Sequence, residues 1–132
     1  MNIKSSQTLV EEAQKNIETL SPNEVKSLSE KKEITLIDVR DIRELWKEGT
    51  IENSNHIPRG MLEFWLDPES SYYKANKIKD IKKLVLFCAL GWRSALATKS
   101  LVDMGFNNVA HVDGGFDALK KSGLKIIEKE KK

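Results

Sequence analysis

Short apolar runs that alternate with amphipathic segments constrain the fold of this chain more than any other feature. The runs "ITLIDVR" (34–40), "KLVLFC" (83–88) and "NVAHVDGG" (108–115) are rich in aliphatic and β-branched residues and have the length of buried strands. Amphipathic segments with helical spacing lie between and around them. Strands that alternate with helices predict an α/β domain with a largely parallel sheet.

Helix signals flank these strands. Ser21-Pro22 is typical of a helix start, and Gly105 and Gly123 are typical of helix ends. The spacing predicts helices at 5–18, from Pro22, at 41–47, from Ser94 to Gly105 and at 116–123. We also predict a short edge strand at 56–58, one helical turn at 61–65 and a loop at 67–77.

The length and the even composition of the chain suit one domain. A chain of 132 residues can bury a core without disulfides or metal ions, and it contains no low-complexity linker. We therefore expect residues 1–132 to form a single domain. Its N-terminal helical segment, 1–33, would pack on the core. Residues 124–132 would form a charged tail, and the end of this tail, "EKEKK" (128–132), would be frayed and solvated.

Charge and cysteine content narrow the classes of protein. The 22 Lys and Arg residues are scattered among 20 acidic residues, whereas binding of nucleic acid requires clustered basic side chains. No apolar run has the length of a membrane span, and the N-terminus lacks the apolar stretch of a signal peptide. One cysteine forms neither an internal disulfide nor a multi-thiolate metal site, which predicts a protein of the reducing cytoplasm.

That cysteine, Cys88, follows a predicted buried strand directly. Ligands of parallel α/β sheets bind at the carboxyl ends of strands. The loop "CALGWRS" then turns the chain into a helix, so its backbone N–H groups and the helix start favour a thiolate at Cys88. Gly91 permits an unusual backbone conformation, and Arg93 can bind an oxyanion. The predicted site loop consists of Cys88, Ala89, Leu90, Gly91, Trp92, Arg93 and Ser94.

With these motifs the chain resembles the single-domain rhodaneses, the thiosulfate-type sulfurtransferase family. The resemblance is carried by "LIDVRDIREL" (36–45), "HIPRG" (56–60), "VLFCALGWRSALA" (85–97) and "MGFNNVAHVDGGFDAL" (104–119). It implies a rhodanese-like fold, a central, mostly parallel sheet of about five strands flanked by helices.

The resemblance also implies persulfide chemistry. The Cys88 thiolate would take sulfane sulfur from a small donor such as thiosulfate or a persulfide, and would pass it to a thiol or thioredoxin-like acceptor. No metal ion or organic cofactor is required, and a protein partner stays open. Asp38 and Arg40 match the family's D-V-R motif and would support the loop or attract the donor, and Arg59 would add positive charge at the entrance.

Several alternatives stay open at this point. A non-catalytic binding module could use the same fold, although it would not need a thiolate loop. Phosphatases and arsenate reductases of this superfamily have five residues between cysteine and arginine, whereas four residues separate Cys88 from Arg93. Trp92 is either a rim residue or a wall that selects substrates. We interpret His56 and His111 as structural, because neither lies beside Cys88 in the sequence.

Overall fold

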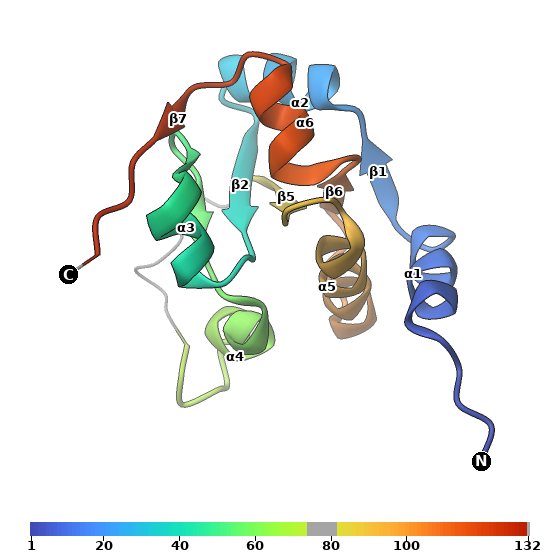
Figure 1. The fold of residues 1–132 in the computed structure, drawn as a ribbon. Helices are drawn as coiled ribbons and strands as arrows, with labels where there is room; N and C mark the ends of the chain where they lie inside the picture. Colours follow the sequence, from blue (N-terminus) through green and yellow to red (C-terminus); the bar gives the residue numbers. More distant parts are fainter. Residues whose placement is uncertain (74–81, 132) are drawn as a thin grey trace.

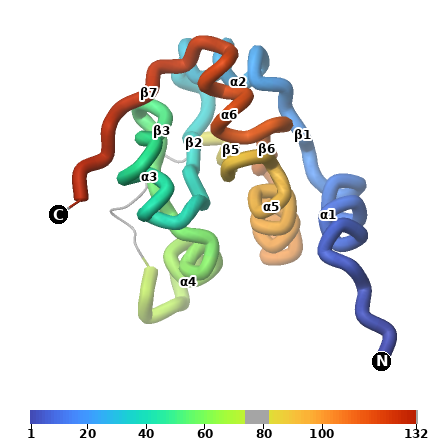
Figure 2. Tube along the Cα trace, viewed as in Figure 1, coloured from blue at the N-terminus to red at the C-terminus, as the bar shows by residue number. Residues whose placement is uncertain are grey.

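A computed structural model describes residues 1–73 and 82–131 and forms an α/β sandwich (Figures 1 and 2). The helices are α1 (Ser6–Gln14), α2 (Pro22–Glu30), α3 (Ile42–Glu48), the short 3₁₀ helix η1 (Arg59–Met61), α4 (Leu62–Leu66), α5 (Trp92–Met104) and α6 (Gly115–Lys121). The strands are β1 (Glu18–Leu20), β2 (Ile34–Asp38), β3 (Thr50–Ile51), β4 (Asn55–His56), β5 (Lys83–Phe87), β6 (Val109–Val112) and β7 (Ile126–Ile127).

Five strands form one parallel sheet, in the order β1-β6-β5-β2-β4. The predicted parallel sheet of about five strands is thus confirmed. The cysteine-bearing strand β5 is the central strand of this sheet, between β6 and β2. Such a strand is covered on both faces, which explains why its residues 84–87 are all apolar.

Two hydrophobic cores lie on the two faces of the sheet. Side chains of a strand alternate between faces, so Leu84 and Leu86 of β5 enter one core and Val85 and Phe87 enter the other. Helices α4 and α5 cover the first face, with α1 packed against α5, and α2 and α6 cover the second (Figure 1). Cys88 continues the alternation and lies in the first core, beneath α5.

The structure corrects the predictions for the two ends of the chain. The first helix ends at Gln14, and residues 18–20 form the edge strand β1 instead of continuing that helix. Near the C-terminus, Ile126–Ile127 form β7, a strand that the sequence did not predict, which pairs antiparallel with β3. Strands this short are stabilised by their partners, and apolar periodicity does not reveal them.

The remaining predicted elements lie close to their expected positions. The predicted edge strand appears as β4, and the predicted helical turn appears as α4. Of the predicted loop 67–77, residues 67–73 contain neither helix nor strand, and residues 74–77 lie outside the described residues. Among the helices of the described ranges, each is too short or too polar to traverse a lipid bilayer.

Candidate active site

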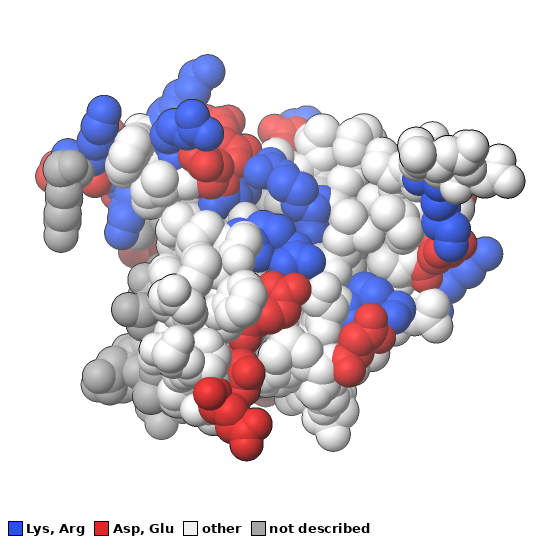
Figure 3. All heavy atoms as spheres, turned by 90° about the horizontal axis from the view of Figure 1, so that it is seen from below, with Lys and Arg blue, Asp and Glu red and all other residues white. Residues whose placement is uncertain are grey.

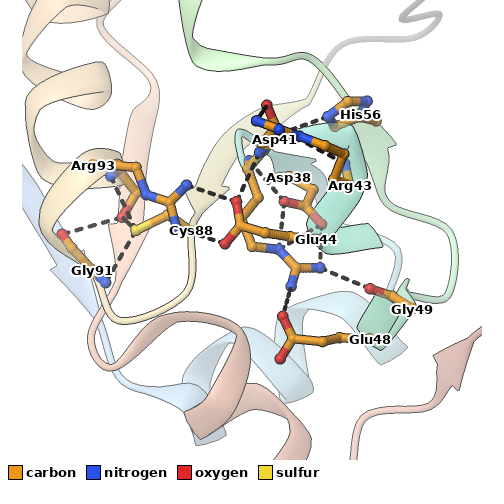
Figure 4. A network of polar contacts seen from close by, with 12 residues as sticks. Asp38, Asp41, Arg43, Glu44, Glu48, Gly49, His56, Cys88, Gly91 and Arg93 are labelled. Atoms are coloured by element: carbon orange, nitrogen blue, oxygen red, sulfur yellow. Dashed lines mark hydrogen bonds and ion pairs between the residues drawn. The ribbon is translucent and has the colours of Figure 1, made fainter. Parts of the chain in front are cut away.

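Cys88 lies one residue beyond β5, at the start of a tight loop that leads into α5 (Figure 4). Its side chain is almost completely covered, with an exposed fraction of 1%. The helix begins at Trp92, two residues earlier than predicted. Gly91 forms the N-cap of α5 with φ of +115°, a conformation that side chains other than glycine's rarely adopt. Gly91 therefore permits the loop to curl round the sulfur.

Two backbone N–H donors and one hydroxyl group of the loop and helix lie around the Cys88 sulfur. The backbone N–H of Gly91 donates to Sγ at 3.1 Å and that of Ser94 at 3.3 Å, while the Ser94 hydroxyl oxygen lies at 3.5 Å. The sulfur also lies at the N-terminal end of the 13-residue helix α5, whose dipole attracts negative charge. The N–H groups and the helix dipole thus direct partial positive charge toward the sulfur.

Helix α6 holds the loop from behind. The N–H group of Phe116 donates to the Cys88 carbonyl oxygen at 2.7 Å, and that of Asp117 to the Ala89 carbonyl oxygen at 3.5 Å. Gly115 has φ of +61°, and a Cβ atom there would lie 2.5 Å from the Cys88 carbonyl oxygen. The D-G-G motif thus fixes the shape of the cysteine loop through contacts that tolerate no side chain at this glycine.

Arg93 is bound by an acidic residue of a neighbouring helix. Its two terminal nitrogens donate to the Glu44 carboxylate at 2.8 and 2.9 Å (Figure 4). Glu44 is held in turn by the capping box of α3, where it accepts a hydrogen bond from the Asp41 N–H at 2.9 Å. The hydrogen bond from Arg93 lowers the pKa of Glu44, and the same bond raises the pKa of Arg93.

Asp38 and Arg40 form a fully buried ion pair. The guanidinium of Arg40 donates to both Asp38 oxygens and to the Gly49 carbonyl oxygen, the latter at 2.8 Å. It also lies 4.0 Å from the ring centroid of Phe116, which belongs to the helix behind the cysteine loop. In this position Arg40 connects the end of β2 to the support of the loop and is not exposed to an incoming donor.

Two large apolar side chains of the cysteine loop and the start of α5 are exposed. Leu90 in the loop is 61% exposed, and Trp92, the first residue of α5, is 68% exposed. A groove of about 600 Å³ between α1 and the start of α5 is lined by Val10, Trp92, Arg93 and Leu96, among others. An accessible apolar wall with an arginine beside it suits a ligand that has an apolar part and a negative charge.

Charges are mixed on the molecular face seen in Figure 3. Lys and Arg side chains lie beside Asp and Glu side chains there, and uncharged residues cover most of that face. Exposed ion pairs of the described residues include Lys4 with Glu12 and Arg43 with Asp41. The face drawn in Figure 3 therefore shows no continuous basic strip among its described residues.

Comparison with known proteins identifies the family. The model of the rhodanese-like domain family matches residues 21–122, which include the cysteine loop and both of the helices that hold it. The chain belongs to the rhodanese-like family.

Several relatives of this rhodanese-like chain have sulfurtransferase names. A mouse protein named thiosulfate sulfurtransferase/rhodanese-like domain-containing protein 3 is 35% identical over 97 residues, which cover 70% of this chain and 62% of the mouse protein. The chain thus spans less than two thirds of that relative.

Two solved structures are similar over almost the whole chain. The polysulfide-sulfur transferase homodimer of Wolinella succinogenes is 35% identical with a TM-score of 0.72, and the match covers 93% of this chain and 87% of that one. A Rhodopseudomonas palustris protein of unknown function, described as a possible tyrosine phosphatase, is 40% identical with a TM-score of 0.88, and the match covers 96% and 97%.

Arg59 lies apart from the cysteine loop in this rhodanese-like domain. Its guanidinium binds the Glu63 carboxylate at 2.9 Å and the Ser100 hydroxyl at 3.1 Å. These contacts join η1 to α4 and α5, and they neutralise the charge that was expected to widen the positive entrance.

His111 lies close to the cysteine loop, which the sequence analysis did not predict. Its Nδ1 lies 3.0 Å from the Ser94 hydroxyl oxygen, which in turn lies next to the Cys88 sulfur. Alternation along β6 could have indicated this position, because His111 faces the same side as Val109, beneath α5. His56 bonds the Arg40 carbonyl oxygen through Nε2 at 2.7 Å, a structural contact.

Metal ligands are not grouped in the part of the chain that the structure describes. Its His, Cys, Asp and Glu side chains form no cluster of three that could hold a metal ion.

Proposed function

We propose that this rhodanese-like chain is a sulfurtransferase that carries sulfane sulfur on Cys88 as a persulfide. The observation that supports the proposal most is the ring of donors around a single sulfur, with N–H groups at 3.1 and 3.3 Å. Such donors stabilise the thiolate that attacks, and they stabilise it again when it leaves. The sulfurtransferase names of the mouse and Wolinella relatives point in the same direction.

The reaction proceeds in two displacements. The Cys88 thiolate attacks the outer sulfur of thiosulfate, a new S–S bond forms at Sγ, and sulfite leaves with the electron pair of the broken S–S bond. An acceptor thiolate then attacks the outer persulfide sulfur. That sulfur leaves on the acceptor, and Cys88 recovers the electron pair as a thiolate. A small persulfide or polysulfide can replace thiosulfate as the donor.

Arg93 and Trp92 are the residues we propose for donor selection. The Arg93 guanidinium is partly exposed at the start of α5, where it can bind the oxygens of an anionic donor. Trp92 contributes an exposed apolar wall to the groove beside it. Asp38 and Arg40 take a supporting role beneath the loop.

A phosphatase is the second candidate, because the Rhodopseudomonas relative has that description. The loop length argues against it. Four residues lie between Cys88 and Arg93, one fewer than in the phosphatases, and this shorter loop fits one sulfur atom better than a bulky tetrahedral phosphate.

Intact-protein mass spectrometry after treatment with thiosulfate tests the proposal. Wild type should gain one sulfur atom and lose it to cyanide, and Cys88→Ser should gain none, because a serine hydroxyl is not ionised at neutral pH. p-Nitrophenyl phosphate is offered in parallel. The protein would be a phosphatase instead if it releases phosphate in a Cys88-dependent manner and takes no sulfur from thiosulfate, a small persulfide or a polysulfide. A protein inert to all four reagents would be a binding module.

A further inference from the structure

A row of polar side chains leads from the buried sulfur to the surface. The Ser94 hydroxyl oxygen lies 3.5 Å from Cys88 Sγ and 3.0 Å from His111 Nδ1. On the other side of the imidazole, His111 Nε2 lies 3.1 Å from the Thr19 hydroxyl oxygen. Ser94 and His111 are buried, whereas Thr19 is exposed. The row thus has one end at the reactive atom and the other in solvent.

The sheet brings these residues together from three distant segments. Strand β1 is the edge of the sheet and pairs with β6, with Thr19 directly opposite His111. Ser94 belongs to the first turn of α5, which packs over β6. The two side chains that flank the imidazole therefore occupy fixed positions on an edge strand and on the helix of the cysteine loop.

The proton count of these groups allows two arrangements. A hydroxyl has one proton, and a neutral imidazole carries one proton on either nitrogen. With a Cys88 thiol, S–H donates to Ser94, Ser94 donates to His111 Nδ1, and Nε2–H donates to Thr19. With a thiolate, Ser94 donates to the sulfur, Nδ1–H donates to Ser94, and Nε2 accepts from Thr19. Every contact in the row is satisfied in both arrangements.

We propose that Ser94, His111 and Thr19 form a proton path between the Cys88 sulfur and solvent at the edge strand β1. The thiol proton moves to Ser94 while the Ser94 proton moves to His111 Nδ1. The proton on His111 Nε2 moves to Thr19, and the Thr19 proton passes to water. One proton leaves the protein, Cys88 becomes a thiolate, and His111 stays neutral with its proton on the other nitrogen. The catalytic use of this path rests on the proposed sulfur transfer.

Burial of the site gives the path its purpose. Cys88 is 1% exposed, and a bound donor would cover the loop further, so solvent cannot exchange protons with the sulfur from the front. Burial lowers the pKa of His111, and the negative charge of Asp113 opposes this effect only in part. The lowered pKa keeps the imidazole neutral, as the path requires. The Ser94 hydroxyl can also donate to the Gly91 carbonyl oxygen, but that contact is longer, 3.3 Å against 3.0 Å.

Nitrogen NMR of the two histidines tests the path without a sulfur donor. Across the titration of Cys88, His111 should stay neutral while its proton moves from Nε2 to Nδ1. His56 is an internal control, because its Nε2 faces the Arg40 carbonyl oxygen and has to keep its proton. In Ser94→Ala the tautomer of His111 should no longer respond to Cys88. Each of three results would overturn the proposal. The His111 tautomer could stay unchanged in wild type, His111 could become an imidazolium when Cys88 is a thiolate, or the tautomer could still respond to Cys88 in Ser94→Ala.

Kinetics of sulfur loading test whether the proton uses the path. Thr19→Val removes the outer hydroxyl at an exposed position, and Thr19→Ser keeps it as a matched control. Single-turnover rates of sulfur loading are measured from about pH 5 to about pH 8. At the acidic end of this range, Thr19→Val should load sulfur about tenfold more slowly than wild type, whereas Thr19→Ser should load it at the wild-type rate. Wild-type rates for Thr19→Val at every pH would overturn the path. If wild type itself loads no sulfur, the proposed function fails, and the tautomer measurement still decides the path.

Discussion

The Arg93 guanidinium donates two parallel hydrogen bonds to the Glu44 carboxylate, at 2.8 and 2.9 Å. The one basic side chain of the cysteine loop, Arg93, is therefore already bound before a donor arrives. An anionic donor that uses Arg93 has to compete with Glu44, whereas a neutral donor does not.

Glu44→Gln should lower the KM for thiosulfate about twofold to fivefold, because a partly exposed ion pair is worth at most about 1 kcal/mol. Glutamine keeps the capping box of α3, so the fold is preserved. Initial rates over a range of thiosulfate concentrations measure the change. Glu30→Gln, with the same loss of charge at the end of α2, is the control, and an unchanged or raised KM in Glu44→Gln contradicts the prediction.

The start of α3 should make the protein sensitive to acid. A hydrogen bond from the Arg43 side chain lowers the pKa of Asp41 to about 2. A folded-state pKa below the unfolded one means that the stabilisation is complete above about pH 4 and is lost as the pH falls towards 2. The free energy of unfolding in urea should therefore fall over this range. It should fall less in Asp41→Asn, which keeps the N-cap, and an equal slope in the two proteins would refute the assignment.

Arg40→Met should destabilise the domain by about 3–5 kcal/mol, because it leaves the buried Asp38 carboxylate without its partner. The double variant Asp38→Asn, Arg40→Met removes both charges and should recover part of this loss. Urea unfolding of the wild type, both single variants and the double variant measures the coupling. Strictly additive losses would show that the two residues do not stabilise each other.

Gly115→Ala should slow sulfur loading strongly, because the new Cβ would meet the carbonyl oxygens of Cys88 and Ala89 at 2.5 and 2.6 Å. Gly105→Ala is the matched control. It also has a positive φ, +108°, but no heavy atom lies within 4 Å of its Cβ position. Both variants should lose about 1–2 kcal/mol of stability from backbone strain, and only Gly115→Ala should lose activity. Equal activity in the two would show that the loop does not depend on this contact.

The central strands could be predicted from sequence because burial on both faces makes most of their residues apolar. β2, β5 and β6 were predicted for this reason, and the end of α5 was marked by Gly105. The strands β1, β3 and β7 have two or three residues each, too few to show an alternating pattern. Their existence depends on partners far along the chain, and no local pattern encodes it.

The cysteine loop could likewise be predicted, since its residues are adjacent in the sequence. The contacts that surround it could not. The place of His111 depends on the register of β6 beside β5, where Leu86 lies opposite His111. The burial of Arg40 depends on Phe116, 76 positions later in the sequence. Arginine is mostly exposed in proteins, so composition alone suggests the opposite position.

The only cysteine in the sequence is also a natural probe of local opening. Its sulfur lies under a loop that Phe116 and Gly115 hold from behind, so a bulky maleimide reaches it only after the loop separates from α6. Labelling rates in increasing urea would therefore report the free energy of that separation without an engineered label. Rates that exceed those of global unfolding would identify the active site as the part of the domain that opens first.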